Sequence, residues 1–307
     1  MSENQKSVGL RIALPNGSLE EGTLRLFEEA NLKIWKDSRK HVALIYSPLI
    51  LRVTFMRPQH IPALVERGVY DVGICGSDCI EESETHVIQI AELPYGRGAS
   101  NGVAKVVLVT SKENPVETIE QVERESVVLS EYPSITKRAF AQRMPVDIRF
   151  SYGGTEAHIP GDYRYGVCLT DTGASLKANG LKVIHTLLET HTCLITSREI
   201  LSTTAESPKE HESKKLVVAL KHLLLGTLAA RERVFLVMNV QTRSKERLLK
   251  QLPALKTPTV TPLADGDYFS VGAVVLKDEL NALIPALLMN GAEDLVEMPI
   301  SKVIRSW

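Results

Sequence analysis

Short apolar runs alternate with amphipathic stretches in the N-terminal part of the chain. Residues 10–14 form an apolar run of strand length, and Leu24 and Phe27 recur near helical spacing after the turn that follows it. Further strands are predicted at 42–45, 49–56 and 71–76, and helices at 61–67 and 79–84. Ser77 or Asp78 is expected to cap the second of these helices. Such alternation predicts an α/β unit whose sheet is covered on both faces.

A second set of alternating elements follows. Predicted strands cover 103–110, 126–129, 146–150 and 166–170, predicted helices cover 116–122 and 134–142, and one helical turn covers 176–179. Two more strands, at 181–188 and 191–195, are expected to run back to the first unit. The first unit is therefore expected to contain segments from both sides of the second.

The pattern changes again after residue 205. Leucines recur on one face of a long helical segment at 206–232, which is typical of a connector helix. Beyond it, strands are predicted at 235–240, 257–263, 268–276 and 292–300, and helices at 244–252 and 278–290. This βαββαβ order predicts a small ferredoxin-like α+β domain.

Composition and charge narrow the classes of function. The chain has 307 residues, 44% of them hydrophobic and 24% charged, as in globular proteins. Its 36 basic and 37 acidic residues leave a net charge of -1, which excludes a global field that attracts nucleic acid or an anionic membrane. No segment approaches ~18 uninterrupted apolar residues, and the first apolar run is too short for a signal peptide. We therefore expect a cytoplasmic protein that holds any anionic ligand locally.

The cysteines show no metal-binding spacing. The sequence contains no Cys-x-x-Cys pair and no histidine at zinc spacing from a cysteine, so all four are predicted to be reduced core thiols: Cys75, Cys79, Cys168 and Cys193.

Three loops that follow predicted strands carry candidate chemistry. In Thr-Asp-Thr-Gly-Ala-Ser at 170–175, small and hydroxyl-bearing residues open a helical turn, where unpaired main-chain N–H groups can hold a phosphate. Thr172 and Ser175 could add hydroxyl donors, although a plain turn is the alternative. Gly153 and Gly154 allow close approach of a ligand, with Glu156 beside them as either a ligand-facing or an exposed carboxylate. The third loop, 15–18, follows the first strand, and all three are expected to meet in one cleft.

Several motifs in fixed order carry a resemblance that covers nearly the whole chain. They include LRIALPNGSL, IPALVERGVYDVGICGSDCIEE, SEYPSITKRAF, YGGTEAHIP, TDTGASLKANGLKVI and NGAEDLVEMPISKVI. In these stretches the chain resembles the ATP phosphoribosyltransferase family, in its long form with a C-terminal regulatory domain.

The resemblance implies a fold and an assembly. It implies an α/β core of two lobes like a periplasmic binding protein, a C-terminal ferredoxin-like (ACT-like) domain, and a homo-oligomer, either a hexamer, as is usual for the long form, or a dimer. The expected parts are 1–100 with 185–205 as the first lobe, 101–184 as the second, 206–232 as connector helix and 233–307 as regulatory domain.

The resemblance also implies a reaction. It is the transfer of the phosphoribosyl group of phosphoribosyl pyrophosphate (PRPP) to N1 of ATP, the first step of histidine biosynthesis. Pyrophosphate leaves, Mg²⁺ is the cofactor, and L-histidine is the effector.

Site residues are carried over by position. Glu156 and Asp171 would be catalytic. PRPP would be bound by Gly153, Gly154, Thr155, Asp171, Thr172, Gly173, Ala174 and Ser175. The nucleotide would be bordered by Asn16, Gly17, Ser18, Arg57, Asp71, Gly76 and Tyr132.

The chain also departs from the family pattern. Asn16 and Ser18 stand where the family usually has Lys and Arg, and Arg164 and Cys168 stand where it usually has two aspartates. Two alternatives therefore stay open: a member that uses another acceptor than ATP, and a non-catalytic regulatory paralogue that keeps the cleft.

Overall fold

The structure is a computed structural model that describes residues 9–37, 41–96, 102–202, 208–253, 255, 257–264 and 266–304. The chain divides into two compact units, Met1–Lys221 and His222–Trp307, which we describe separately. Among the described residues, no helix has the length and apolar character needed to cross a membrane.

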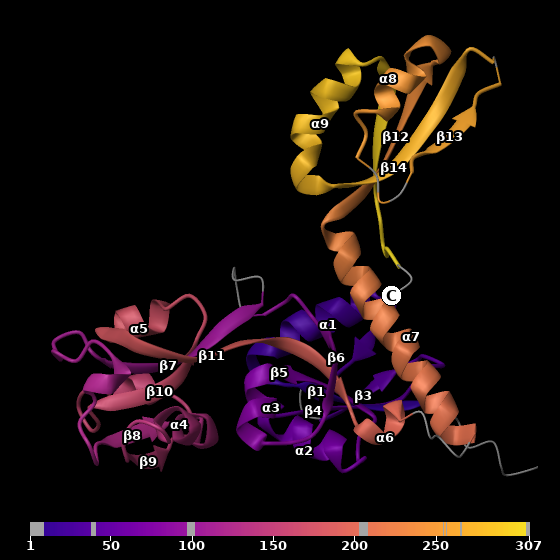
Figure 1. The fold of residues 1–307 in the computed structure, drawn as a ribbon. Helices are drawn as coiled ribbons and strands as arrows, with labels where there is room; N and C mark the ends of the chain where they lie inside the picture. The colour runs from indigo at the N-terminus through magenta and orange to yellow at the C-terminus, as the bar shows by residue number, and fades with distance from the viewer. Residues whose placement is uncertain are drawn as a thin grey trace, which may run out of the picture. The chain divides into compact units, whose positions relative to one another are not determined.

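The first unit is built on one sheet that runs through two lobes (Figure 1). In the described residues the strand order is β2-β3-β4-β1-β5-β11-β7-β10-β8-β9, with β6 also paired to β11. The strands of the first lobe, lobe I, are β1 (Leu10–Pro15), β2 (Ile34–Trp35), β3 (Val42–Ile45), β4 (Ile50–Met56), β5 (Val72–Gly76) and β6 (Ile88–Glu92). Those of the second, lobe II, are β7 (Val103–Ser111), β8 (Val127–Ser130), β9 (Asp147–Phe150) and β10 (Tyr165–Thr170).

Strand β11 (Leu181–Thr196) belongs to both lobes. Residues 181–191 pair antiparallel with β7 of lobe II, and residues 192–196 pair with β5 of lobe I. The sequence predicted two strands here, and this prediction is wrong, because 189 and 190 stay paired to β7 and leave no break. The boundary predicted between residues 184 and 185 lies within this strand.

Short helices cover the sheet and connect its strands. Those of the first unit are α1 (Glu20–Glu29), α2 (Ile61–Glu66), α3 (Ser77–Ser83), α4 (Pro133–Phe140), α5 (Ala174–Ala178) and α6 (Arg198–Leu201), and α7 (Pro208–Arg231) starts in this unit and ends in the next. The helix predicted at 116–122 is only a 3₁₀ turn over Ile119–Gln121. Val116, Ile119 and Val122 are all buried. Their spacing of three matches the 3₁₀ repeat rather than the α-helical one.

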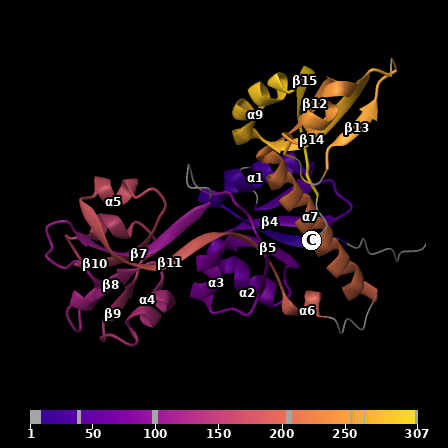
Figure 2. The same cartoon turned by 45° about the horizontal axis from the view of Figure 1, so that its top comes forward.

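The second unit has the predicted ferredoxin-like arrangement. Its sheet order is β13-β14-β12-β15, formed by β12 (Arg233–Gln241), β13 (Thr259–Pro262), β14 (Tyr268–Leu276) and β15 (Ala292–Pro299). Alternate residues of β12 are buried against α8 (Lys245–Leu249) and α9 (Lys277–Met289), which therefore cover the same face of the sheet. Figure 1 labels both helices, and Figure 2 shows α9 beside the sheet from a second direction. The fold class, a two-lobed α/β core with a C-terminal α+β module, is confirmed.

Burial on lobe II's strands yields a stability prediction. Val107 on β7 is 1% exposed in an apolar cluster, whereas Val183 on β11 is 45% exposed. Val107→Ala removes two buried methyl groups and leaves a cavity, so we expect a loss of about 2 kcal/mol of unfolding free energy. Val183→Ala is the matched control and should change it by less than about 0.5 kcal/mol. Chemical denaturation measures both, and equal losses would contradict the burial of Val107.

Candidate active site

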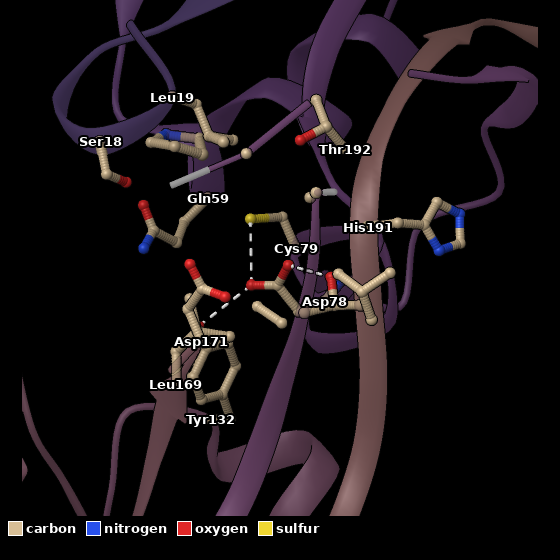
Figure 3. A pocket seen from close by; sticks show the side chains of 17 residues that line it. Ser18, Leu19, Gln59, Asp78, Cys79, Tyr132, Leu169, Asp171, His191 and Thr192 are labelled. Atoms are coloured by element: carbon tan, nitrogen blue, oxygen red, sulfur yellow. Dashed lines mark hydrogen bonds between the residues drawn. The ribbon is translucent and has the colours of Figure 1, made fainter. Parts of the chain in front are cut away.

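A pocket lies between the two lobes, where β11 changes partner (Figure 3). Its volume, including space open to solvent, is about 670 Å³, which suits a small-molecule ligand. Its lining includes Ser18, Gln59, Gly76, Asp78 and Cys79 from lobe I, Tyr132, Leu169 and Asp171 from lobe II, and Thr190, His191 and Thr192 from β11.

The sheet topology explains why these residues meet. In lobe I, β1 runs parallel to β4 and β5, and in lobe II, β8 runs parallel to β10. Ser18, Gln59 and Asp78 follow the carboxyl ends of β1, β4 and β5, and Tyr132 and Asp171 follow those of β8 and β10. Because ligands in open α/β sheets gather beyond the carboxyl ends of strands, both lobes present their binding edges to one pocket.

Asp78 holds the centre of this pocket. Asp78 is 6% exposed. Its Oδ1 accepts a hydrogen bond from Thr190 Oγ1 at 2.6 Å, and its Oδ2 accepts one from the Tyr132 hydroxyl at 3.0 Å. The Cys79 thiol also donates to Oδ2, at 3.7 Å. Burial, together with the charge of Asp78, raises the pKa of Tyr132, so its hydroxyl stays protonated and remains a donor.

The expected helix cap is absent. No side chain caps α3, which begins after Gly76, and the Asp78 carboxylate faces the pocket instead. Gly76 is required at this junction, because a Cβ there would lie 2.0 Å from Asp78 Oδ1. The predicted nucleotide residue Gly76 therefore also makes room for the buried carboxylate.

Of the other predicted nucleotide residues in the loops of lobe I, Ser18 lines the pocket, whereas Asn16, Gly17 and Arg57 do not. Arg57 is an exposed residue directly before Pro58 and Gln59, which do line it. The Asn16 Oδ1 atom is buried and accepts no hydrogen bond from the described residues. Gly17 lies in the left-handed region, φ 76°, outside the pocket lining.

Asp71 was predicted to border the nucleotide, but it lies away from the pocket and is paired with Arg11. Its carboxylate accepts hydrogen bonds from the Arg11 main-chain N–H at 2.7 Å and from the Arg11 guanidinium at 2.6 Å. It precedes the amino end of β5, whereas the pocket lies at the carboxyl end, roughly 15 Å along the strand. Asp71 therefore anchors the edge of the sheet away from the pocket and does not border a ligand there.

The two predicted PRPP loops lie side by side. Ser175 Oγ donates a hydrogen bond to Glu156 Oε1 at 2.9 Å. Gly153, Gly154 and Gly173 all have positive φ, and a Cβ on any of them would meet nothing within 4 Å. The side of each loop that a ligand could approach is therefore open. Ala174, at the start of α5, is exposed, and its main-chain N–H donates to Thr172 Oγ1 at 3.4 Å.

These loops differ in their relation to the pocket. Of their predicted residues, Asp171 lines the pocket, and its Oδ1 is buried and accepts no hydrogen bond from the described residues. Thr155 is fully buried, and its hydroxyl donates to Glu131 Oε1 at 3.0 Å, so its side chain does not face a ligand as predicted. Thr155 instead fixes the base of the 153–156 loop.

With this geometry established, comparison with known proteins identifies the family. The model of "HisG: ATP phosphoribosyltransferase" matches residues 57–222, and that of "HisG, C-terminal domain" matches 230–302. The chain belongs to the ATP phosphoribosyltransferase family. The enzyme of this name from Pelotomaculum thermopropionicum is 35% identical over 296 residues, covering 96% of this chain and 99% of the relative. "ATP phosphoribosyltransferase 1" of Geobacter sulfurreducens is 33% identical over 301 residues, covering 96% and 99%.

A solved structure shares the fold. It is the "ATP phosphoribosyl transferase (HisG:HisZ) complex from Thermotoga maritima", with a TM-score of 0.54 and 22% identity. The match covers 68% of this chain and 99% of the other.

Two of the departures from the ATP phosphoribosyltransferase pattern, Arg164 and Cys168, are in lobe II and outside the pocket lining. Arg164 precedes the amino end of β10 and forms an ion pair with Glu123 at 2.7 Å. Cys168 is 1% exposed in an apolar cluster, where burial and the nearby Glu156 raise its pKa. Neither Arg164 nor Cys168 belongs to the described lining of the pocket. The carboxylates of that lining are those of Asp78 and Asp171.

The described lining of the pocket contains no lysine or arginine. Arg97 lies outside the described residues. Lys105 on β7 is paired with Glu189 at 3.0 Å. Among the residues that the structure describes, no group of three or more His, Cys, Asp or Glu side chains is placed to hold a metal ion.

Sequence reasoning missed Asp78, Gln59 and Thr190. Asp78 and Gln59 follow the carboxyl ends of strands, which is the signal that singled out the other loops, so the same rule could have found them. Thr190 carries no such signal, because it lies inside β11 and reaches the pocket only through the pairing of that strand.

The buried thiols provide a pH-dependent prediction. Burial raises the pKa of Cys79 and Cys168, and a side-chain hydrogen bond with Cys193, together with burial, raises that of Cys75. A raised pKa reduces the thiolate fraction, so all three should react with iodoacetamide at least tenfold more slowly than free cysteine between about pH 7 and 9. Mass spectrometry of the native protein measures this, with denatured protein as control. Native labelling of Cys79 at the free-cysteine rate would contradict its buried bond to Asp78.

Proposed function

We propose that this chain transfers the phosphoribosyl group of PRPP to N1 of ATP and releases pyrophosphate, the first step of histidine biosynthesis. The observation that carries the proposal is the interlobe pocket, which Asp171 of the 171–175 loop lines, in a chain that matches ATP phosphoribosyltransferases over 96% of its length. Two substrates must meet in this reaction, and a pocket formed by two binding edges suits that requirement.

Lobe II is the proposed PRPP side. Main-chain N–H groups of 172–175, with the Thr172 hydroxyl, would hold the 5-phosphate, while the Ser175 hydroxyl donates to Glu156. Gly153 and Gly154 lie beside this loop through the bond between Glu156 and Ser175. They leave room for the sugar and its pyrophosphate.

Lobe I is the proposed acceptor side. Ser18 and Gly76 of this lobe, together with Tyr132 from lobe II, would border the nucleotide, and the amide of Gln59 offers both a donor and an acceptor to it. Arg57, exposed at the rim, would supply positive charge to the triphosphate where Asn16 and Ser18 supply none.

The chemistry requires no nucleophilic side chain, because N1 of the acceptor attacks C1 of the ribose. Positive charge develops at this carbon as pyrophosphate leaves, and a fixed carboxylate nearby stabilises it. Asp171 has a buried oxygen without a partner among the described residues, whereas Asp78 already accepts three hydrogen bonds. Asp171 is therefore the proposed stabilising group, with Glu156 oriented by Ser175 at its side.

Magnesium fits this donor set. The ion usually binds one or two carboxylates together with substrate phosphates rather than a complete protein cage. The unpartnered Asp171 oxygen matches that requirement. We propose that Asp171 would hold the ion, which would neutralise charge on the pyrophosphate.

Assembly and regulation complete the proposal. We infer a homo-oligomer, hexameric as in long family members, with L-histidine as the effector and residues 233–307 as its receptor. The matched C-terminal family model supports this assignment of the second unit.

An activity assay tests the reaction. The purified chain with Mg²⁺, PRPP and ATP should release pyrophosphate and form phosphoribosyl-ATP, detected by mass spectrometry. Asp171→Asn removes a fixed charge from the developing cation, so kcat/KM should fall about 100-fold. Asp147→Asn, an exposed substitution in lobe II, is the matched control. Turnover with another nucleophile but not ATP would favour a different acceptor, and binding without any turnover would favour a regulatory paralogue.

A second assay tests the effector. L-Histidine should lower the rate of pyrophosphate release severalfold, because binding that favours a less active state shifts the whole oligomer. D-Histidine at equal concentration is the control. An unchanged rate at saturating PRPP and ATP and at concentrations near their KM would contradict regulation by histidine.

A further inference from the structure

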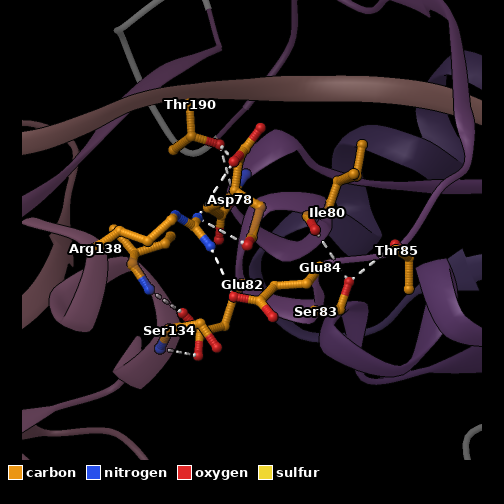
Figure 4. Close-up of polar contacts among 11 residues, drawn as sticks. Asp78, Ile80, Glu82, Ser83, Glu84, Thr85, Ser134, Arg138 and Thr190 are labelled. Atoms are coloured by element: carbon orange, nitrogen blue, oxygen red, sulfur yellow. Dashed lines mark hydrogen bonds and ion pairs between the residues drawn. The ribbon is translucent and has the colours of Figure 1, made fainter. Parts of the chain in front are cut away.

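Helix α4 of lobe II begins without a cap from its own sequence. Tyr132 occupies the N-cap position with Pro133 after it, and no side chain at that position caps the helix. The main-chain N–H groups of Ser134 and Ile135 instead donate to Glu82 Oε1 and Oε2, at 2.9 and 3.0 Å (Figure 4). Glu82 belongs to α3 of lobe I. One lobe therefore supplies the carboxylate that satisfies the free amides of the other.

Further contacts join the same two helices. Arg138, one turn along α4, donates to the Glu81 main-chain oxygen at 2.9 Å and to its carboxylate at 3.2 Å. Its other terminal nitrogen donates to Glu84 Oε1 at 3.1 Å. The bond between Tyr132 and Asp78 lies at the pocket end of this contact. We name the contacts of Glu81, Glu82 and Glu84 with α4 the interlobe clasp.

Besides the clasp and the bond between Asp78 and Tyr132, two crossings of the chain connect the lobes. The chain passes between lobes after β6 and again within β11, which exchanges its partner between His191 and Thr192. Extended crossings of this kind can act as hinges. The clasp lies outside the crossings and joins α3 to α4. It therefore also sets the distance between Asp78, which is in α3, and Tyr132, which precedes α4.

We propose that Glu82 is a positioning residue, which with Arg138 keeps the two lobes closed around the pocket before substrate binds. This inference rests on the proposed function only where it concerns kinetics. Because apparent affinity falls by the fraction of molecules in the binding-competent state, opening the lobes raises the KM of substrates held by both. The bound complex is closed in either case, so kcat is retained.

Variants of Glu82 test the clasp. Glu82→Ala should raise KM for ATP and PRPP about five- to tenfold and leave kcat within twofold, whereas Glu82→Gln, which keeps one acceptor oxygen, should lie between. Glu113→Gln, an exposed change in lobe II, is the control. A fall in kcat at unchanged KM would show a role in folding alone and overturn the proposal.

Exchanging the charges of Arg138 and Glu81 tests their interaction across the lobes and leaves Glu82 unchanged. Arg138→Glu faces two carboxylates and should raise KM as Glu82→Ala does. Adding Glu81→Arg should bring KM back within twofold of the starting value. Failure of the second change to reverse the first would overturn the proposal, and this pair decides the question if Glu82→Ala does not fold.

A measurement without substrate separates this inference from the proposed function. Cys79 lines the pocket from lobe I, so open lobes should expose it to iodoacetamide. Its alkylation should be at least fivefold faster in Glu82→Ala and Arg138→Glu than in the unaltered chain and Glu113→Gln. Fraying of α4 alone would leave this rate unchanged, and an unchanged rate overturns the clasp even if the enzyme turns over. A raised rate supports the clasp even if no variant shows phosphoribosyl transfer.

Discussion

The buried carboxylate of Asp78 is the constraint on which the pocket depends. Asp78 is 6% exposed, and its buried carboxylate needs hydrogen-bond donors, because burying an unpaired charge costs several kcal/mol. Its donors come from three places: Tyr132 in lobe II, Thr190 in β11, and Cys79 in its own helix. Satisfying Asp78 therefore requires both lobes and the crossing strand to meet at one point. Gly76 leaves the space in which that can happen.

The charge around this point also explains how anionic substrates can use an acidic pocket. Asp78 and Asp171 face the pocket, and its described lining has no lysine or arginine. Carboxylates repel phosphates but favour a carbon on which positive charge develops. Under the proposed function, the part of the pocket near Asp78 and Asp171 therefore suits the ribose carbon and the base. The phosphates belong at the main-chain amides of the 172–175 loop and at the rim near Arg57.

Sequence reasoning succeeded where the signal was local. Strand β5 is a fully buried run without polar residues, and the order of elements from β12 to β15 follows from periodicity, so the fold class could be predicted. It failed where packing overrode the local pattern. Val116, Ile119 and Val122 gave a helical pattern but are buried by a 3₁₀ turn, and β11 continues through residues that look like a break.

The candidate site shows the same division. The sequence by itself determined the family, the order of the elements, and the glycine and hydroxyl residues of the 153–156 and 171–175 loops, because these depend on short-range chemistry. Only the tertiary structure decided that Asp71 faces Arg11 at the far end of its strand and that Thr155 points into the core. Only the tertiary structure brought the Glu82 carboxylate to the first turn of α4, where its partner Ser134 lies 52 residues further along the chain. Such contacts follow from strand direction and lobe packing, which bring together residues that no local pattern relates.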